Sequence, residues 1–172
     1  MGREDTFARD TIHDLCYAYC MDEKTLFKRA DMLLNSYRRI CFATYLDDEE
    51  EETLFEKSPL DLILFLEEVD PSMNSKDFVR AVRERANRKW IIEMVDSALA
   101  KVQETPLYGA QYFDLLNKRY IIQVNYTEPD LLVALHLERS RYYDKRWEAV
   151  VMFGLCFWGS VIPRMKKTLT EE

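Results

Sequence analysis

Apolar residues recur three and four positions apart along most of this 172-residue chain, with polar and charged residues between them. That spacing places apolar side chains on one face of an α-helix, whereas a half-buried β-strand requires alternation, of which the chain has no sustained stretch. Only four Gly and five Pro interrupt the pattern. We therefore expect an all-α fold, a helical bundle with helices near residues 6–20, 22–45, 59–70, 75–105 and 107–123 and two more toward the C-terminus.

Helix boundaries are marked by capping residues and prolines. Ser58-Pro59 predicts a helix start and Asp70-Pro71 its end, and Thr105-Pro106 stops the long helix that Ser75 opens. The acidic run of residues 47–52 is predicted to be a solvated loop, with a site for a basic partner as the alternative. A boundary at that loop or at residues 70–75 gives an N-terminal helical part, 1–70, and a C-terminal part, 71–172. No long linker separates them, so they can pack as one body.

The segment 127–147, TEPDLLVALHLERSRYYDKRW, has the pattern of a capped short helix, a tight turn and a second helix. Thr127 can cap the first helix, and Asp130, three residues on, can complete a capping box. Pro129 fits the first turn, where its missing N–H is not needed. The apolar face of this helix is Leu131, Leu132, Leu135 and Leu137. Residues 136–138 are the predicted turn, and the second helix begins near Arg139.

The second helix carries hydrogen-bond donors over its first two turns, where the recognition helix of a helix-turn-helix meets base edges and phosphates. The residues expected to read or line the major groove are Arg139, Ser140, Arg141 and Tyr143. Those expected to hold phosphates are Lys145, Arg146 and Lys118 or Arg119. We also expect Thr127, at the start of the first helix, to belong to this DNA-binding set. Tyr142 is expected to pack inward as an anchor and Tyr143 to point outward.

These residues resemble the ArpU-type phage transcriptional regulators, whose C-terminal halves are similar to region four of bacterial sigma factors. The resemblance covers roughly residues 88–160. It rests on the run Arg119-Tyr120-Ile121, on Thr127-Glu128, and on LERSRYY at residues 137–143 followed by Ala149. The family usually has a small residue at the turn and a Ser at the second cap, where this chain has His136 and Glu138.

The resemblance implies a sequence-specific regulator of a phage or prophage that activates late genes. It would bind double-stranded DNA beside a promoter and recruit host RNA polymerase, or replace part of a sigma factor. The acidic N-terminal helices would carry dimerisation or polymerase contact. The alternative is a helical adaptor or packaging component, similar to a small terminase subunit, in which the helix-turn-helix is degenerate.

The charge of the chain is unevenly distributed. The net charge is −7, yet the segment from Lys118 to Lys167 holds nine Lys or Arg against five Asp or Glu. A basic C-terminal segment attached to an acidic body favours a nucleic-acid partner at that end. A second basic cluster, Arg80, Arg83, Arg85, Arg88 and Lys89, is expected to form surface ion pairs, with phosphate contact as its alternative.

Other chemistry has little support in the sequence. The chain has two histidines, no nucleophile elbow and no glycine-rich phosphate loop, so an enzyme is not expected, and no cofactor is implied. The four cysteines lack a CxxC pair, which favours reduced thiols in the cytoplasm of the bacterial host. A zinc site from His13, Cys16, Cys20 and Cys41 is the alternative to buried thiols on a helix face.

Two further expectations concern apolar residues. The longest apolar run, residues 150–162, is too short to span a bilayer, so no membrane partner is expected. Five aromatic residues on the first two helices are expected to fill the core rather than to form a partner surface. They are Tyr17, Tyr19, Tyr37, Phe42 and Tyr45.

Overall fold

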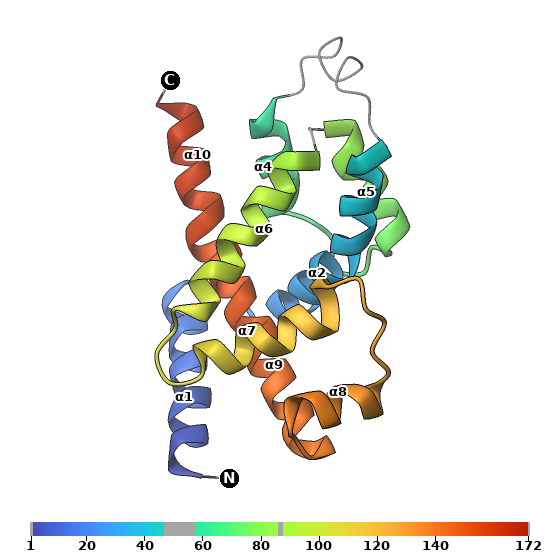
Figure 1. Ribbon diagram of the computed structural model, residues 1–172. Coiled ribbons are helices and arrows are strands. Elements are labelled where there is room, and N and C mark those ends of the chain that lie inside the picture. The colour runs from blue at the N-terminus through green and yellow to red at the C-terminus, as the bar shows by residue number, and fades with distance from the viewer. Residues whose placement is uncertain (1, 47–57, 86–87, 172) are drawn as a thin grey trace.

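The computed structural model describes residues 2–46, 58–85 and 88–171, and every regular element in these ranges is helical (Figure 1). The all-α prediction is confirmed. In chain order the elements are α1 (Arg3–Ala18), α2 (Glu23–Leu46), α4 (Pro59–Glu67), α5 (Ser75–Arg85), α6 (Arg88–Gln103), α7 (Gly109–Leu116), the π-helical segment η1 (Asn117–Ile121), α8 (Glu128–Leu135), α9 (Arg139–Cys156), the π-helical segment η2 (Phe157–Val161) and α10 (Ile162–Thr170). The acidic run at residues 47–52 lies outside the described residues.

Helix α9 is the centre of the core. It packs against α1, α2, α6 and α7, and from Glu148 to Leu155 every residue is buried. A Cβ on Gly154 would lie 2.8 Å from the side chain of Leu26, so the glycine lets α2 approach α9 closely. Because α9 is covered on several sides, only its N-terminal turns are positioned to face solvent.

Helix α9 continues through η2 into α10 as one long helix, Arg139–Thr170, which crosses the molecule in Figure 1. Pro163 lacks the N–H that an α-helix would use at that position, and the π-helical turn of η2 directly precedes it. By length and composition this helix could cross a membrane. However, 67% of its most apolar stretch is buried inside the protein, as in the core helix of a soluble fold.

The predicted long helix of residues 75–105 is described as two helices, α5 and α6. The apolar stripe weakens there, because Ala86 is the only apolar residue between Val82 and Trp90. Both helices pack on α2, but their other neighbours differ: α5 also packs on α4, whereas α6 also packs on α7, α9 and η2. Each helix therefore follows its own part of the core.

The expectation that the N-terminal aromatic residues fill the core is wrong for four of the five. Tyr37 is buried, but Tyr17 and Tyr45 are each 87% exposed, and Tyr19 and Phe42 are also exposed. Helix α1 buries the face of Ala8, Ile12 and Cys16 instead. A helix at the surface needs only one apolar face, so aromatic residues on its other face stay largely exposed.

Helices from both sides of the predicted boundary near residue 70 contribute to one hydrophobic core. The clearest case is the packing of α2, before the boundary, on α9, after it. Leu33 and Leu34 of α2 and Val150 and Phe153 of α9 are all fully buried. Separating residues 1–70 from the rest would therefore expose a large apolar surface on both pieces.

Candidate nucleic-acid interface

The short helix α8 is built by local hydrogen bonds that its sequence predicts. The Thr127 hydroxyl accepts the backbone N–H of Asp130 at 3.3 Å, and the Asp130 carboxylate accepts the backbone N–H of Thr127 at 3.2 Å. The predicted capping box is confirmed, with Pro129 in the first turn. The helix ends at His136, whose φ of 55° is left-handed and turns the chain toward α9. The segment is thus helix, three-residue turn and helix.

The first two turns of α9 present one outward face. Arg139, with its side chain 73% exposed, Ser140 and Tyr143 point to solvent, whereas Tyr142 is buried. The predicted orientations of the two tyrosines are confirmed. Glu128 of α8 holds this face in place, because its carboxylate accepts a hydrogen bond from the Tyr143 hydroxyl at 2.7 Å and pairs with Arg139 Nε at 3.0 Å.

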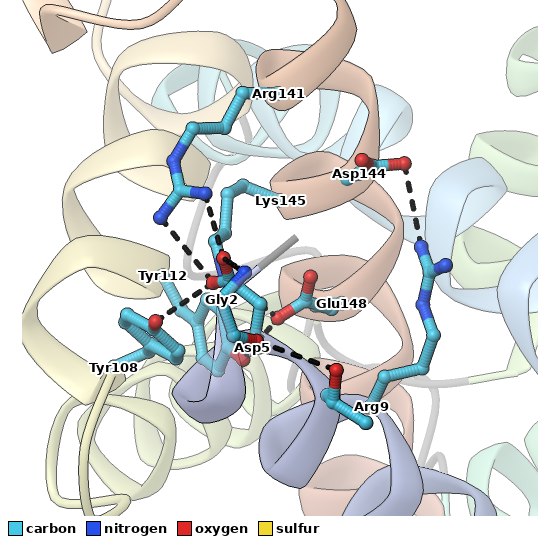
Figure 2. A network of polar contacts seen from close by, with 10 residues as sticks. Gly2, Asp5, Arg9, Tyr108, Tyr112, Arg141, Asp144, Lys145 and Glu148 are labelled. Atoms are coloured by element: carbon cyan, nitrogen blue, oxygen red, sulfur yellow. Dashed lines mark hydrogen bonds and ion pairs between the residues drawn. The ribbon is translucent and has the colours of Figure 1, made fainter.

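Arg141 and Lys145 turn instead toward α1, where both meet Asp5 (Figure 2). The Arg141 guanidinium donates to the Asp5 carboxylate at 2.8 and 3.3 Å, and the Lys145 ammonium donates to it at 2.8 Å. The Tyr108 hydroxyl donates to the same carboxylate at 2.7 Å. These donors, Arg141 first, hold the pKa of Asp5 far below its usual range.

The network is deepest at Lys145, whose side chain is 1% exposed. Its ammonium lies 3.1 Å from a Glu148 carboxylate oxygen and 3.6 Å from the centre of the Tyr108 ring. Glu148 also accepts the Tyr112 hydroxyl at 2.7 Å, and burial raises the pKa of Tyr112. Two carboxylates face Lys145 and Arg141, so the cluster is electrically balanced and joins α1, α7 and α9.

A surface hollow of about 290 Å³ lies over this network. Its lining residues are Asp5, Ser140, Arg141, Asp144, Lys145 and Glu148. Arg9 of α1 closes one side by donating to Asp144 at 3.3 Å, as Figure 2 shows. The wall of the hollow is therefore mostly ion pairs already made within the protein.

Arg146 points to the opposite side of α9, toward α2 and η1. Its guanidinium donates to Asp31 at 2.9 Å and to the Tyr120 hydroxyl at 3.1 Å. That hydroxyl in turn donates to Asp31 at 2.7 Å. The three side chains form a closed triangle that fixes α9 to α2.

These contacts bear on two of the expected phosphate contacts, Lys145 and Arg146. Lys145 cannot reach a phosphate unless the network with Asp5 opens, because its ammonium is buried between two carboxylates. Arg146 is mostly buried and is bound to Asp31. The structure therefore brings Arg139, Ser140 and Tyr143 together on one outward face and turns Lys145 and Arg146 into the protein. Arg141 is intermediate, since its side chain remains 44% exposed while it binds Asp5.

The remaining expected contacts lie before α8. Lys118 pairs with Asp114 of α7, one helical turn earlier. Arg119 stacks over the Tyr120 ring, with its guanidinium carbon 4.9 Å from the ring centre. Thr127 is exposed at the start of α8 and its hydroxyl caps that helix. Of the two cations, Lys118 therefore has a carboxylate partner, whereas no ion pair joins Arg119 to an acid among the described residues.

Asp5, Glu148 and Asp31 were not anticipated from the sequence as members of this region. Asp5 is 140 residues from Lys145, and no local pattern joins them. One signal was present: Lys145 lies three residues after Tyr142 and four before Ala149, on the buried stripe of α9. A cation on a buried helix stripe requires acidic partners, and Glu148 at the next turn is one.

The other candidate clusters are not assembled as sites. Within residues 2–46, 58–85 and 88–171, no group of three or more His, Cys, Asp or Glu side chains could hold a metal ion. Cys16 is buried, Cys20 is exposed, and His13 contacts Glu23. In the second basic cluster, Arg85 lies over the Phe65 ring, 4.4 Å from its centre, and donates to the carbonyl of Ala81.

Comparison with known proteins gave no match: no family model, no curated protein and no solved structure matches this chain. Functional reasoning therefore starts from the contacts and exposure of the residues themselves.

Proposed function

We propose that this protein binds double-stranded DNA through the exposed N-terminal turns of α9, with the start of α8 held beside them by Glu128. The observation that carries the proposal is the outward face of Arg139, Ser140 and Tyr143 on a helix whose other faces are fixed in the core. A recognition helix needs the same division, because base reading requires donors held by a rigid scaffold. Both the capping box of α8 and the inward Tyr142 support it.

The N-terminus of α9 combines features that suit an anion with acidic side chains that oppose one. The N-cap residue Glu138 makes no side-chain hydrogen bond to the first turn, so the N–H groups there lack a side-chain acceptor, but the Glu138 carboxylate adds a negative charge. Arg139 adds a positive charge at the same place. Against this, Glu128 neutralises part of that charge by pairing with Arg139. We therefore expect modest non-specific affinity and a contribution from base contacts to specific affinity.

In this proposal the residues divide by role. Arg139 and Ser140 donate to base edges in the major groove, and the Tyr143 ring packs along the groove wall. Arg141 reaches DNA only by exchanging Asp5 for a phosphate. Lys145 holds α1 to α9 and has no DNA role. As a regulator, the protein would act at a promoter, with its acidic helices available to a polymerase or a second copy.

The test is binding of the full chain to a pool of duplex fragments from the source genome, measured by fluorescence anisotropy with sequencing of the retained fragments. The variants are Arg139→Ala and Tyr143→Ala, with Arg164→Ala on α10 as an exposed-arginine control. Loss of Arg139 should cost about 1–3 kcal/mol at the preferred sequence and relax specificity there. Absence of binding by the wild type, or equal enrichment by wild type and Arg139→Ala, would reject the proposal.

A second candidate, the helical adaptor or packaging component, is favoured by one observation. Phe7 and Tyr17 are 65% and 87% exposed on the outer side of α1, and Asp10 and Asp14 lie between them at helical spacing. An apolar and acidic helix face suits a protein partner. Light scattering with size-exclusion chromatography separates the two, since a ring favours packaging and a monomer or dimer favours regulation.

A further inference from the structure

Two arginines, Arg38 and Arg119, are neighbours beside α9, and neither forms an ion pair with a described carboxylate. Arg38 of α2 donates through Nη2 to the backbone carbonyl of Arg119 in η1 at 3.3 Å. The Arg38 Nε is buried and has no acceptor among the described residues. Burial, and then repulsion by Arg119, lowers the pKa of Arg38. This guanidinium is therefore partly desolvated, repelled by a neighbour and incompletely hydrogen-bonded.

An acid on the same helix as Arg38 is already engaged. Asp31, on α2 like Arg38, binds Arg146 at 2.9 Å and the Tyr120 hydroxyl. Lys145 and Arg146, by comparison, are balanced by carboxylates: Lys145 has two, and Arg146 has Asp31. No ion pair joins Arg38 or Arg119 to an acid within the described ranges. These two neighbouring cations therefore lack a described counter-charge, and an external anion would relieve their repulsion.

The pair also adjoins the proposed DNA-contacting turns. Arg119 lies over the ring of Tyr120, whose hydroxyl accepts a hydrogen bond from Arg146 of α9 at 3.1 Å. Burial raises the pKa of Tyr142, and, in keeping with this position, the nearby positive charges of Arg119 and Arg146 oppose that rise. Arg119 therefore lies next to the start of α9, on its α2 side.

We infer that Arg38 and Arg119 form an anion site that takes a phosphate group through their two guanidinium groups, and that in the DNA complex this is a backbone phosphate flanking the α9 contact. The planar fork of each arginine matches the oxygens of a phosphate. The second half of the inference rests on the proposed function, whereas the first half does not. An isolated phosphate ion is the other source of the same chemistry.

The first arm of the test measures duplex DNA binding of the full chain by anisotropy from about 50 to 200 mM salt. The variants are Arg38→Gln, Arg119→Gln and their combination, with Arg164→Gln as matched control. Loss of one phosphate contact lowers the salt slope by about one, so over this range the wild type should lose about fourfold more affinity than the double variant. If the wild type binds DNA, equal affinity and slope in wild type and double variant would overturn the assignment of a DNA backbone phosphate to this site and leave the proposed function standing.

The second arm uses inorganic phosphate with chloride at equal ionic strength as control, and measures the Tm by circular dichroism. At about ten times its Kd, phosphate should raise the wild-type Tm by roughly 3–6 °C and leave the double variant unchanged. An Arg38→Lys, Arg119→Lys variant keeps both charges, so it should retain part of the shift if the fold is intact. If the wild type binds no DNA but shows this selective shift, the proposed function fails and the anion site holds. An equal shift in wild type and double variant overturns the site.

Discussion

Replacing Asp5 with Asn should strongly destabilise the protein, because its one carboxylate accepts hydrogen bonds from three side chains. Asn keeps the shape but removes the charge opposite Lys145 and Arg141. Removing one partner of a buried ion pair costs about 3–5 kcal/mol. In Asp5→Asn, Lys145 still has Glu148 at 3.1 Å, so the cost should lie at the lower end of this range. Loss of the ion pair with the half-exposed Arg141 adds less than about 1 kcal/mol. We expect a loss of about 3 kcal/mol.

For a chain of this length that loss corresponds to a fall in Tm of about 6–12 °C. Urea and thermal unfolding followed by far-UV circular dichroism would measure it. The matched control is Asp10→Asn, an exposed carboxylate on the same helix, which should change the free energy of unfolding by less than about 0.5 kcal/mol. Arg141→Gln should cost less than about 1 kcal/mol, since Asp5 then keeps Lys145. If Asp5→Asn unfolds within about 0.5 kcal/mol of the wild type, the network does not stabilise α1 and the account of Lys145 is refuted.

Four further outcomes follow from single features. The folded-state pKa of Asp5 is depressed, so its stabilisation is complete above the unfolded value of about 3.9 and is lost as pH falls toward the folded value. The wild-type free energy of unfolding should therefore drop more steeply than that of Asp5→Asn below about pH 5, and parallel curves would contradict this. Thr127→Ala removes the α8 cap and should cost about 1 kcal/mol in urea unfolding. His136→Gly relieves a left-handed residue and should raise the unfolding free energy by up to about 1 kcal/mol, whereas a decrease would show that the side chain itself stabilises the turn. Gly109→Ala would place a Cβ 2.5 Å from a backbone carbonyl oxygen of α6 and should cost about 1–3 kcal/mol in thermal unfolding.

Local features of the fold were predictable because their causes lie within a few residues. The capping box of Thr127 and Asp130 involves positions three apart, and the structure has it. Ser58 caps α4 by accepting the Leu60 N–H, with Pro59 at the first helical position, as the sequence indicated. Caps and prolines act through the backbone of one turn, so they do not depend on how distant helices pack.

Side-chain destinations on α9 were harder to predict because they depend on which distant helices cover it. Arg139 and Lys145 are both cations in the predicted recognition helix, yet one side chain is 73% exposed and the other 1%. The difference arises from α1, whose Asp5 docks on one side of α9. Periodicity shows which residues share a face, but it does not show which faces a single-layer helix bundle leaves open. For Tyr17 on α1 the prediction failed in the other direction, because we expected a buried side chain and the structure leaves it exposed.

The uneven charge of the sequence has a structural use that its distribution alone does not reveal. Asp5 and Asp31 of the acidic N-terminal helices form ion pairs with cations of the basic C-terminal segment. Part of the positive charge of that segment is therefore neutralised by the contacts that join the two parts. The segment's positive charge therefore overstates the charge that DNA would meet. Near the start of α9, what remains at the surface is Arg139 and, on its flank, the Arg38 and Arg119 pair, which no described acid neutralises. A DNA contact in this protein would depend on those few arginines rather than on a continuous basic face, which is why single substitutions there are informative.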